Sequence, residues 1–229
     1  MQTDMYYDTV IAGCGVAGLY AALKLPASSN ILMICKESME ECDSMLAQGG
    51  ICVLHDEDDY AAYFEDTMRA GHYENNTESV DIMIRQSRPV IEELLRLGVR
   101  FEENADGSLR YTREGGHSRP RICFHKDITG KEITTVLQKH VRECPNITVW
   151  QHTKMTDLLV ERGSCRGIVV ESASQQLINI HAVDTILATG GIGGLYEHST
   201  NYPSLTGDAL SICKKHGVQL DHLDRKSVV

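Results

Sequence analysis

The sequence lacks the spacings that usually hold metals. It has eight cysteines in 229 residues, but no two of them are spaced as C-x-x-C, and no two of its ten histidines are four residues apart. Both absences argue against a zinc or iron–sulfur site built by this chain, because such sites rely on closely spaced ligands. The scattered cysteines are typical of reduced thiols, so we predict no metal site and a cytoplasmic location.

Basic clusters and long apolar runs are also lacking. The formal net charge is −10, and no basic patch is present, which argues against a nucleic-acid partner. The apolar runs are only as long as strands, and 1–4 have none of the basic and apolar character of a signal peptide. We therefore expect no membrane span. With 42% hydrophobic and 24% charged residues, the composition is that of an ordinary globular protein.

A glycine-rich turn follows the first apolar run. Val10–Ala12 is expected to be a buried strand, and a helical pattern from Leu19 to Leu25 follows the glycines. This G-x-G-x-x-G spacing between strand and helix predicts a dinucleotide site, with the phosphates on the helix N-terminus. The alternative is a turn that serves local packing alone, and the turn does not distinguish NAD from FAD. The predicted phosphate-binding residues are Gly13, Gly15, Val16, Ala17 and Gly18.

The end of the second predicted strand departs from the usual NAD pattern. Ile31–Cys35 is followed by Lys36 and Glu37, whereas an acidic residue commonly meets the ribose at this point. Lys36 is a candidate to meet a hydroxyl or a phosphate. A solvated ion pair with Glu37 is an equally good interpretation.

Two further glycine stretches and one carboxylate are candidates for contact with a ligand. The adjacent glycines in Ser44–Ile51 indicate close approach of the backbone to something flat or bulky, or else a simple turn. Thr189–Gly194 is a second glycine-rich turn after a buried strand. Asp208 begins the last predicted helix, where it either caps that helix or binds a ribityl hydroxyl.

The stretch Arg113–Arg121 concentrates polar side chains beside two glycines. It holds a carboxylate, an imidazole, a hydroxyl and three guanidinium groups, which suits an anionic ligand. A solvated loop is the alternative. The acidic run His55–Asp59 is expected to be a solvated helix start.

The remaining pattern predicts an α/β fold: a Rossmann-like domain with a parallel sheet and a small β-meander. Helices are expected at 60–70, at 76–97 with a break or kink at Pro89, and at 127–144. The meander is assigned to 147–151, 157–161, 167–171 and 177–181, and 182–188 to a separate buried strand. We expect one domain over 1–224 and an unmatched tail at 225–229.

Taken together, these stretches resemble the flavoprotein family of L-aspartate oxidase, which is related to succinate dehydrogenase and fumarate reductase flavoproteins. The motifs that carry the resemblance are 13–18, 47–50, 113–118, 127–130, 188–191 and 207–208. The resemblance implies that the dinucleotide is FAD. Beyond the first turn, the residues expected to bind it are Lys36, Asp43, Ser44, Ala47, Gln48, Gly49, Gly50, Thr189, Gly190, Gly191 and Asp208.

Two positions separate the relatives within this resemblance. Succinate dehydrogenases carry a histidine bonded covalently to FAD where this chain has Asp43, so the resemblance implies non-covalent FAD. Glu114 stands where the dicarboxylate enzymes have a neutral residue. A carboxylate there would repel succinate and attract the α-ammonium of L-aspartate, so Glu114 is expected to select and orient that substrate. His117 and Ser118 are candidates to orient the substrate or the flavin edge.

The implied reaction is hydride removal from the aspartate α-carbon by FAD, giving iminoaspartate, with oxygen or fumarate as the electron acceptor. The product would feed quinolinate formation in NAD biosynthesis, with a functional link to quinolinate synthase. The family is longer than this chain and carries its catalytic arginine in later parts, so we expect a truncated and, alone, inactive portion. The alternatives are a fumarate reductase or succinate dehydrogenase type flavoprotein, and a non-catalytic FAD-binding fragment.

Overall fold

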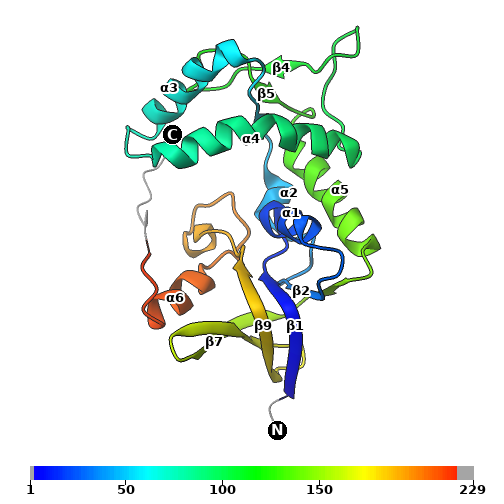
Figure 1. The fold of residues 1–229 in the computed structure, drawn as a ribbon, viewed down its shortest axis with the longest axis vertical. Helices are drawn as coiled ribbons and strands as arrows, with labels where there is room; N and C mark the ends of the chain where they lie inside the picture. The colour runs from blue at the N-terminus through cyan, green and yellow to red at the C-terminus, as the bar shows by residue number, and fades with distance from the viewer. Residues whose placement is uncertain (1–2, 221–229) are drawn as a thin grey trace. The chain divides into compact units, whose positions relative to one another are not determined.

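The structure, a computed structural model, describes residues 3–220 (Figure 1). Within the single domain expected over 1–224, these residues form two units. Unit 1 comprises 3–43 and 138–220, and unit 2 comprises Ser44–Leu137. The division falls inside the helices α2 (Asp43–Leu46) and α5 (Thr129–Glu143). The tail expected at 225–229 lies outside the described residues.

Unit 1 is built on a six-stranded sheet with the order β6-β2-β1-β9-β8-β7. The parallel part consists of β6 (Ile147–Trp150), β2 (Ile31–Ile34), β1 (Thr3–Ala12) and β9 (Leu177–Leu187). The other two strands, β7 (Lys154–Glu161) and β8 (Ser164–Glu171), run antiparallel to their neighbours. The predicted α/β class with a parallel sheet is therefore confirmed.

Two details of the predicted meander are wrong. The strand expected at 147–151 pairs in parallel with β2 and so belongs to the main sheet. The strands expected at 177–181 and 182–188 are one strand, β9, because β1 begins at Thr3 and pairs with β9 along its length, from Ile178 to Leu187. The meander consists of β7, β8 and β9.

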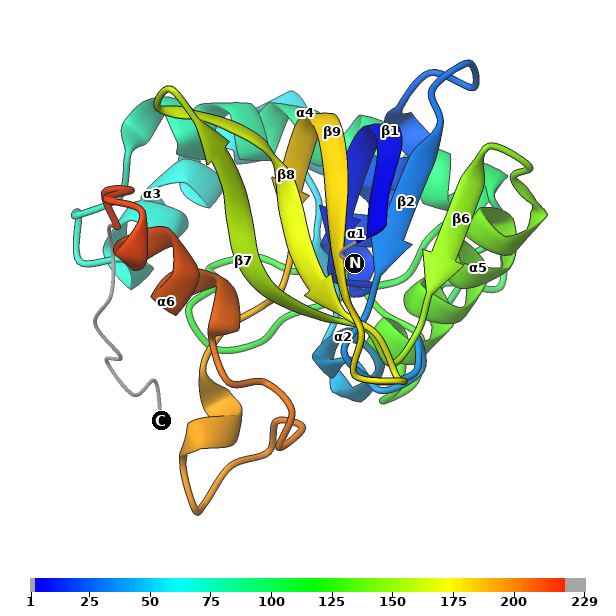
Figure 2. The same cartoon turned by 90° about the horizontal axis from the view of Figure 1, so that it is seen from below.

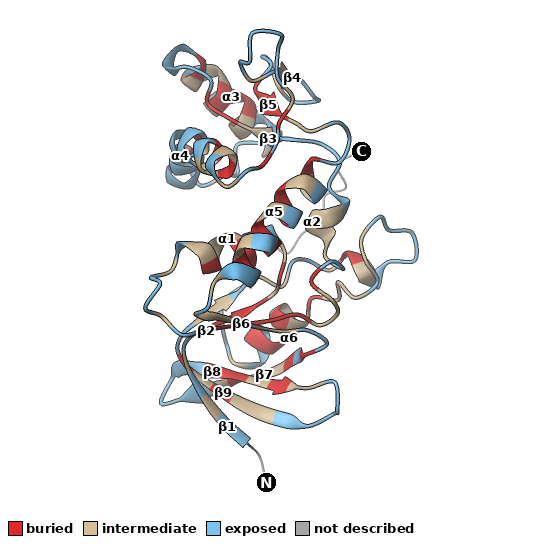
Figure 3. Ribbon diagram, turned by 90° about the vertical axis from the view of Figure 1, so that its right-hand side faces the viewer, coloured by how far each residue is buried: buried red, intermediate tan, exposed pale blue. Residues whose placement is uncertain are grey.

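Helices cover the sheet of unit 1 on the two faces that strand alternation creates (Figure 2). Val10 and Ala12 of β1 join an apolar cluster with Ile212 of α6 (Asp208–Lys215). Ile11, between them, faces α1 (Val16–Lys24), since a Cβ on Gly18 of that helix would lie 3.4 Å from its side chain. Every residue of β2 is buried, as expected for a strand covered on both faces (Figure 3).

An acidic side chain ties the C-terminal end of α6 to the meander. Asp157 of β7 accepts hydrogen bonds from Lys215 Nζ and His216 Nε2. These two donors lower the pKa of Asp157 to about 2. Because the folded-state pKa is depressed, the stabilisation is present above the unfolded value near 4 and is lost as the pH falls through about 2.

We therefore expect Asp157→Asn to lower the free energy of unfolding by about 1–2 kcal/mol at pH 7, after allowance for partial exposure. The difference from wild type should shrink as the pH is lowered from 4 toward 2. Urea unfolding at a series of pH values checks this, and a difference that does not depend on pH would contradict it.

Unit 2 contains two longer helices and a small antiparallel sheet. The helices are α3 (Tyr60–Ala70), preceded by the short η1 (Glu57–Asp59), and α4 (Thr77–Arg96). The sheet consists of β3 (Ile51–Cys52), β5 (Ile122–Cys123) and β4 (Tyr111–Thr112), in that order. The core between the helices is a cluster of Leu54, Tyr63, Met68, Val80 and Ile84.

The helix α4 confirms the predicted cap and excludes the break, one of the two outcomes predicted at Pro89. Asn76 caps it, its side chain accepting a hydrogen bond from Ser79 N at 2.9 Å. Pro89 does not end it, because one helix continues through that position to Arg96. Burial of one apolar face, including Ile84 and Ile91, outweighs the hydrogen bond that proline removes.

Close packing between α1 and β1 depends on a glycine. A Cβ on Gly18 would lie 2.0 Å from the carbonyl oxygen of Gly13, which is backbone and cannot turn aside. We expect Gly18→Ala to destabilise the chain by about 2–3 kcal/mol without FAD, as for an overpacked interior. Urea unfolding measures this. Lys24→Ala, on the exposed side of the same helix, is the control and should stay near wild type; equal stability of the two variants would contradict the packing argument.

Candidate functional site

The first glycine turn of unit 1 lies at the C-terminal end of β1, beside the second glycine-rich turn. Gly13 has φ +117°, and a Cβ there would lie 2.2 Å from the carbonyl oxygen of Ala188. Ala188 N in turn donates to Ala12 O at 2.8 Å. The predicted residues Thr189, Gly190 and Gly191 therefore begin beside the 13–18 turn, at the carboxyl ends of two parallel strands, where open α/β sheets bind ligands.

Glycine also stands where the first helix of unit 1 begins. Gly15 is the N-cap of α1 and brings no side chain that caps the helix, so Val16 and Ala17 begin it directly. Such an N-terminus offers backbone N–H groups to an anion. This turn, with its positive φ at Gly13, fits the pyrophosphate of a dinucleotide.

Lys36 and Asp208 meet each other in unit 1. Lys36 Nζ donates to Asp208 Oδ2 at 2.8 Å, to Thr206 Oγ1 at 2.7 Å and to Ser204 O at 3.1 Å. Burial tends to raise the pKa of Asp208, but the bonds from Lys36 and Thr206 outweigh it and lower that pKa. Gly207 rather than Asp208 is the N-cap of α6. The predicted solvated pair of Lys36 with Glu37 is not formed, and the ammonium is turned toward Asp208 instead.

Asp43 also has protein partners. Its carboxylate accepts hydrogen bonds from Asn201 Nδ2 and, at 2.9 Å, from the backbone N–H of Tyr202. It thereby ties Asp43, the last residue of this part of unit 1, to the loop after the second glycine turn of the same unit. A carboxylate held in this way offers no ring nitrogen for a bond to a flavin.

In unit 2 the segment Ser44–Ala47 lies against the start of α5. A Cβ on Gly130 would lie 2.2 Å from Ser44 O, and Gly130 N donates to Ala47 O at 2.9 Å. This explains the Thr129-Gly130 pair by packing. Thr129 adds a hydrogen bond from His125 N to its hydroxyl at 2.9 Å.

The glycine pairs Gly49-Gly50 and Gly115-Gly116 of unit 2 lie close to one cavity. A Cβ on Gly49 would lie 3.4 Å from Glu114 Oε2, so the carboxylate sits beside the segment that follows Gln48. Next to them is a cavity of about 600 Å³. Its lining includes Gly50, Gly115, Gly116, His117, Cys52, Tyr63, Asp66 and Met83. The structure thus brings together the stretches 48–50 and 114–117, which the sequence predicted separately.

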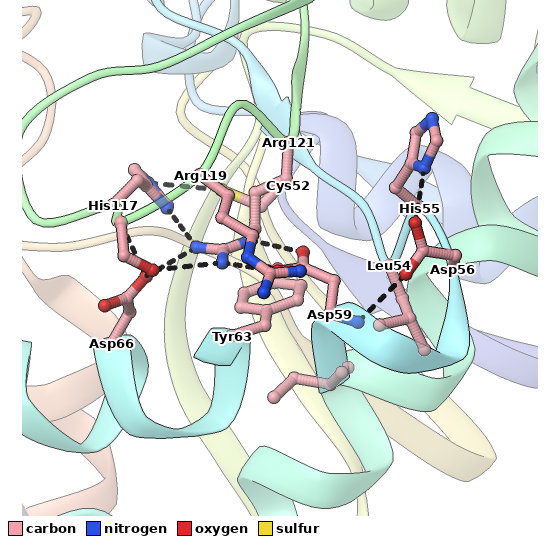
Figure 4. Close-up of polar contacts among 12 residues, drawn as sticks. Cys52, Leu54, His55, Asp56, Asp59, Tyr63, Asp66, His117, Arg119 and Arg121 are labelled. Atoms are coloured by element: carbon pink, nitrogen blue, oxygen red, sulfur yellow. Dashed lines mark hydrogen bonds and ion pairs between the residues drawn. The ribbon is translucent and has the colours of Figure 1, made fainter. Parts of the chain in front are cut away.

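Arg121 was expected among the side chains that meet an anionic ligand, but it is fully buried and bound to protein carboxylates. Its Nε and Nη2 donate to the two oxygens of Asp59 at 2.7 and 2.8 Å, and its Nη1 donates to Asp66 Oδ2 at 2.6 Å (Figure 4). The guanidinium also lies over the ring of Tyr63. The prediction of a solvated run at 55–59 is therefore wrong for Asp59, which is 2% exposed.

His117 and Ser118 are held by the same buried cluster. His117 Nδ1 lies 3.4 Å from Arg121 Nη1, and its Nε2 lies 3.5 Å from Cys52 Sγ. Since a guanidinium only donates, Nδ1 accepts and the proton is on Nε2. Ser118 donates its hydroxyl and its backbone N–H to Asp66 Oδ2, at 2.6 and 2.7 Å. Sequence reasoning missed Asp59 and Asp66, because nothing local marks a carboxylate whose partner lies more than 50 residues away.

The described residues contain no group of three or more His, Cys, Asp or Glu side chains able to hold a metal ion. All eight cysteines are free thiols. No helix between residues 3 and 220 has the length and apolar character needed to cross a membrane.

Residues 8–226 match the family model described as FAD binding domain. The chain belongs to this FAD-binding domain family. FAD is accordingly the dinucleotide, as predicted, and the turn at 13–18 fits it by the geometry above.

Curated relatives of this FAD-binding chain confirm the resemblance seen in its motifs. L-aspartate oxidase of Clostridium perfringens is 41% identical over 216 residues, which cover 94% of this chain and 49% of that protein. L-aspartate oxidase of Neisseria meningitidis serogroup B is 38% identical over 226 residues, covering 98% and 44%. The chain thus spans about half the length of the curated relatives it matches. A solved quinol fumarate reductase of E. coli is similar with a TM-score of 0.90 and 28% identity, covering 94% of this chain and 38% of that one.

Proposed function

We propose that this chain is the FAD-binding part of an enzyme that oxidises L-aspartate to iminoaspartate. The observation that carries the proposal is Glu114, whose carboxylate lies beside Gly49, while the next residues of both segments, Gly115 and Gly50, line one cavity. A carboxylate there favours a substrate with an α-ammonium group over a plain dicarboxylate. The similarity to L-aspartate oxidases supports the same substrate.

Different residues of the chain would bind the cofactor and the substrate. Those of the 13–18 and 189–191 turns would hold the pyrophosphate half of FAD, which when bound supplies the two-electron acceptor. Lys36 and Asp208 would contact hydroxyl or phosphate groups of the cofactor by giving up their mutual hydrogen bond. Glu114 would bind the substrate ammonium, and His117, which lines the cavity, would help to orient the substrate or the flavin edge.

The proposal extends to the reaction partners. Oxygen or fumarate would be the electron acceptor, and similarity to a fumarate reductase is compatible with the latter. An unstable imine product requires a consuming step nearby, which fits quinolinate synthase and NAD biosynthesis in the cytoplasm. A fumarate reductase or succinate dehydrogenase type flavoprotein, the alternative hypothesis, would have the same fold. Glu114 disfavours it, because a carboxylate repels a doubly negative substrate that has no ammonium group.

The cofactor is proposed to be non-covalent, since Asp43 stands where the covalent flavoproteins carry histidine and its carboxylate is bound to Asn201 and Tyr202. Mixing the 229-residue chain with FAD, removing free cofactor and precipitating with acid tests this. The expected result is a yellow protein whose flavin passes entirely into the supernatant. A yellow pellet would contradict non-covalent binding, and a colourless folded protein would contradict FAD binding by this chain alone.

Activity is tested in a chimera in which this chain replaces the matching part of the Clostridium perfringens L-aspartate oxidase. We expect L-aspartate-dependent reduction of the flavin and no comparable reduction by succinate. Turnover of succinate in place of L-aspartate would favour the alternative reading.

A further inference from the structure

Asp66 is the point where the buried Arg121 cluster meets the loop that carries Glu114. Its Oδ2 accepts three hydrogen bonds: from Ser118 Oγ at 2.6 Å, Ser118 N at 2.7 Å and Arg121 Nη1 at 2.6 Å. Its Oδ1 accepts one more, from Arg69. The carboxylate is 4% exposed. Burial tends to raise the pKa of Asp66, but the bonds from Ser118 and Arg121 bring it well below its ordinary value, so the carboxylate is ionised at neutral pH.

The loop that Asp66 holds connects β4 to β5 and has little packing of its own at the tip. Thr112 and Ile122 pair across its base. At the tip, a Cβ on Gly115 or Gly116 would have nothing within 4 Å. A turn closed by His117 N to Glu114 O, at 3.3 Å, links the anchored end to the Glu114 end. Fixing Ser118 and His117 therefore fixes Glu114.

Asp59 provides an internal comparison. It is as buried as Asp66 and binds the same guanidinium through two hydrogen bonds, from Arg121 Nε and Nη2. No hydrogen bond joins Asp59 to Ser118 or to any residue from Glu114 to His117 among the contacts of the described chain. Both carboxylates neutralise Arg121. Asp59 reaches the loop only through the half-exposed Arg119, whose Nε lies 3.6 Å from its Oδ1, whereas Asp66 also binds the hydroxyl and the backbone N–H of Ser118.

We propose that Asp66 is a positioning residue that holds the Glu114–Ser118 loop in the arrangement that binds the ammonium group of an amino dicarboxylate substrate. The part concerning the substrate rests on the proposed function above. Asp66 lines the cavity, but its two oxygens are bound to Ser118, Arg121 and Arg69, so it would act through Ser118 and the turn to Glu114.

Amide hydrogen exchange of the 229-residue chain tests the anchor without any substrate or flavin. In Asp66→Asn we expect the peptide covering 113–120 to exchange about tenfold faster, because an ionic acceptor of the Ser118 N–H is lost. In Asp59→Asn, exchange of this peptide should stay within about twofold of wild type. Equal acceleration in the two variants would overturn the proposal, since the effect would then be general loosening around Arg121.

The second readout is steady-state kinetics in the chimera described above. Asp66→Asn is expected to raise KM for L-aspartate about tenfold and to change kcat less than about threefold, while Asp59→Asn leaves KM near wild type. Faster exchange with an unchanged KM would overturn the substrate role of Asp66. If the wild-type chimera does not oxidise L-aspartate at all, the proposed function fails. The hydrogen-exchange comparison still tests whether Asp66 holds the Glu114–Ser118 loop.

Ser118→Ala keeps the experiment decisive if Asp66→Asn does not fold. It removes the hydroxyl bond at 2.6 Å and retains the carboxylate and the backbone bond. An increase of about threefold in exchange of 113–120 supports the anchor. Exchange equal to wild type would overturn it.

Discussion

Replacing Glu114 with glutamine is expected to lower kcat/KM for L-aspartate by about 100-fold in the chimera with the Clostridium perfringens enzyme. Glutamine keeps the size and hydrogen-bonding reach of the side chain and removes its charge. An α-ammonium would then lose its ionic partner beside Gly49, whereas a dicarboxylate without an ammonium group would no longer be repelled. Succinate should therefore bind more tightly to Glu114→Gln than to wild type.

The measurement is flavin reduction by L-aspartate, with inhibition by succinate as the second quantity. Glu103→Gln is the control, because Glu103 is an exposed carboxylate of the same unit, outside the 113–121 loop. It should leave both quantities unchanged. Aspartate kinetics that are unchanged in Glu114→Gln would remove the charge argument, and with it the main reason for preferring L-aspartate over succinate.

The features that the sequence predicted correctly are those specified by neighbouring residues. The turn at Gly13 follows from three glycines between a strand and a helix, and the structure shows the required positive φ. The helix predicted at 60–70 is α3, with the same bounds, because its apolar spacing and the glycine after it are local signals. The cap at Asn76 is local in the same sense.

The features that the sequence did not predict depend on partners far away in the chain. Ile147–Trp150 has the composition of any short strand, and only its pairing with β2 places it in the parallel sheet. Asp59 stands in an acidic run that resembles a solvated helix start. Its burial is decided by Arg121, 62 residues later. Such long-range pairing leaves no periodicity to detect.

The same difference applies to the candidate site. Local glycine patterns indicated 48–50 and 114–118 as ligand-binding stretches, and the structure shows Gly50 and His117 lining one cavity. The Arg113–Arg121 stretch was interpreted as donors for an anion. In the structure its most buried member, Arg121, is neutralised by protein carboxylates, which makes it a structural support for the loop.

The largest effect on stability is expected from Arg121→Met. The guanidinium uses all three of its nitrogens in hydrogen bonds, two of them to Asp59 and one to Asp66, in a fully buried position. Methionine fills much of the same volume and takes the one buried cation away from two buried carboxylates, which keep only the half-exposed Arg69 and Arg119 beside them. Breaking a buried ion pair in this way costs about 3–5 kcal/mol. We expect the free energy of unfolding of the 229-residue chain to fall by that amount at pH 7.

Arg119→Met is the matched control. Arg119 is half exposed and lies 3.6 Å from the same Asp59, so its loss should cost less than about 1 kcal/mol. Arg121→Lys keeps the charge but not the planar group of donors, so its loss in free energy of unfolding should lie between those of Arg119→Met and Arg121→Met. Urea unfolding of the three variants gives the order directly. Equal stability of Arg119→Met and Arg121→Met would mean that the buried cluster is not what holds unit 2 together.

The pH dependence separates a lost ion pair from a lost packing contact. In wild type the lowered pKa of Asp66 gives stability that is present above the unfolded value near 4 and is lost only as the pH falls below it. In Arg121→Met the same burial acts without the guanidinium, so the pKa of Asp66 should rise, while the bonds from Ser118 and Arg69 still oppose that rise. The deficit of Arg121→Met relative to wild type should therefore shrink as the pH is lowered from 7 toward the unfolded value near 4. A deficit that stays constant over this range would assign the loss to packing against Tyr63 instead of charge.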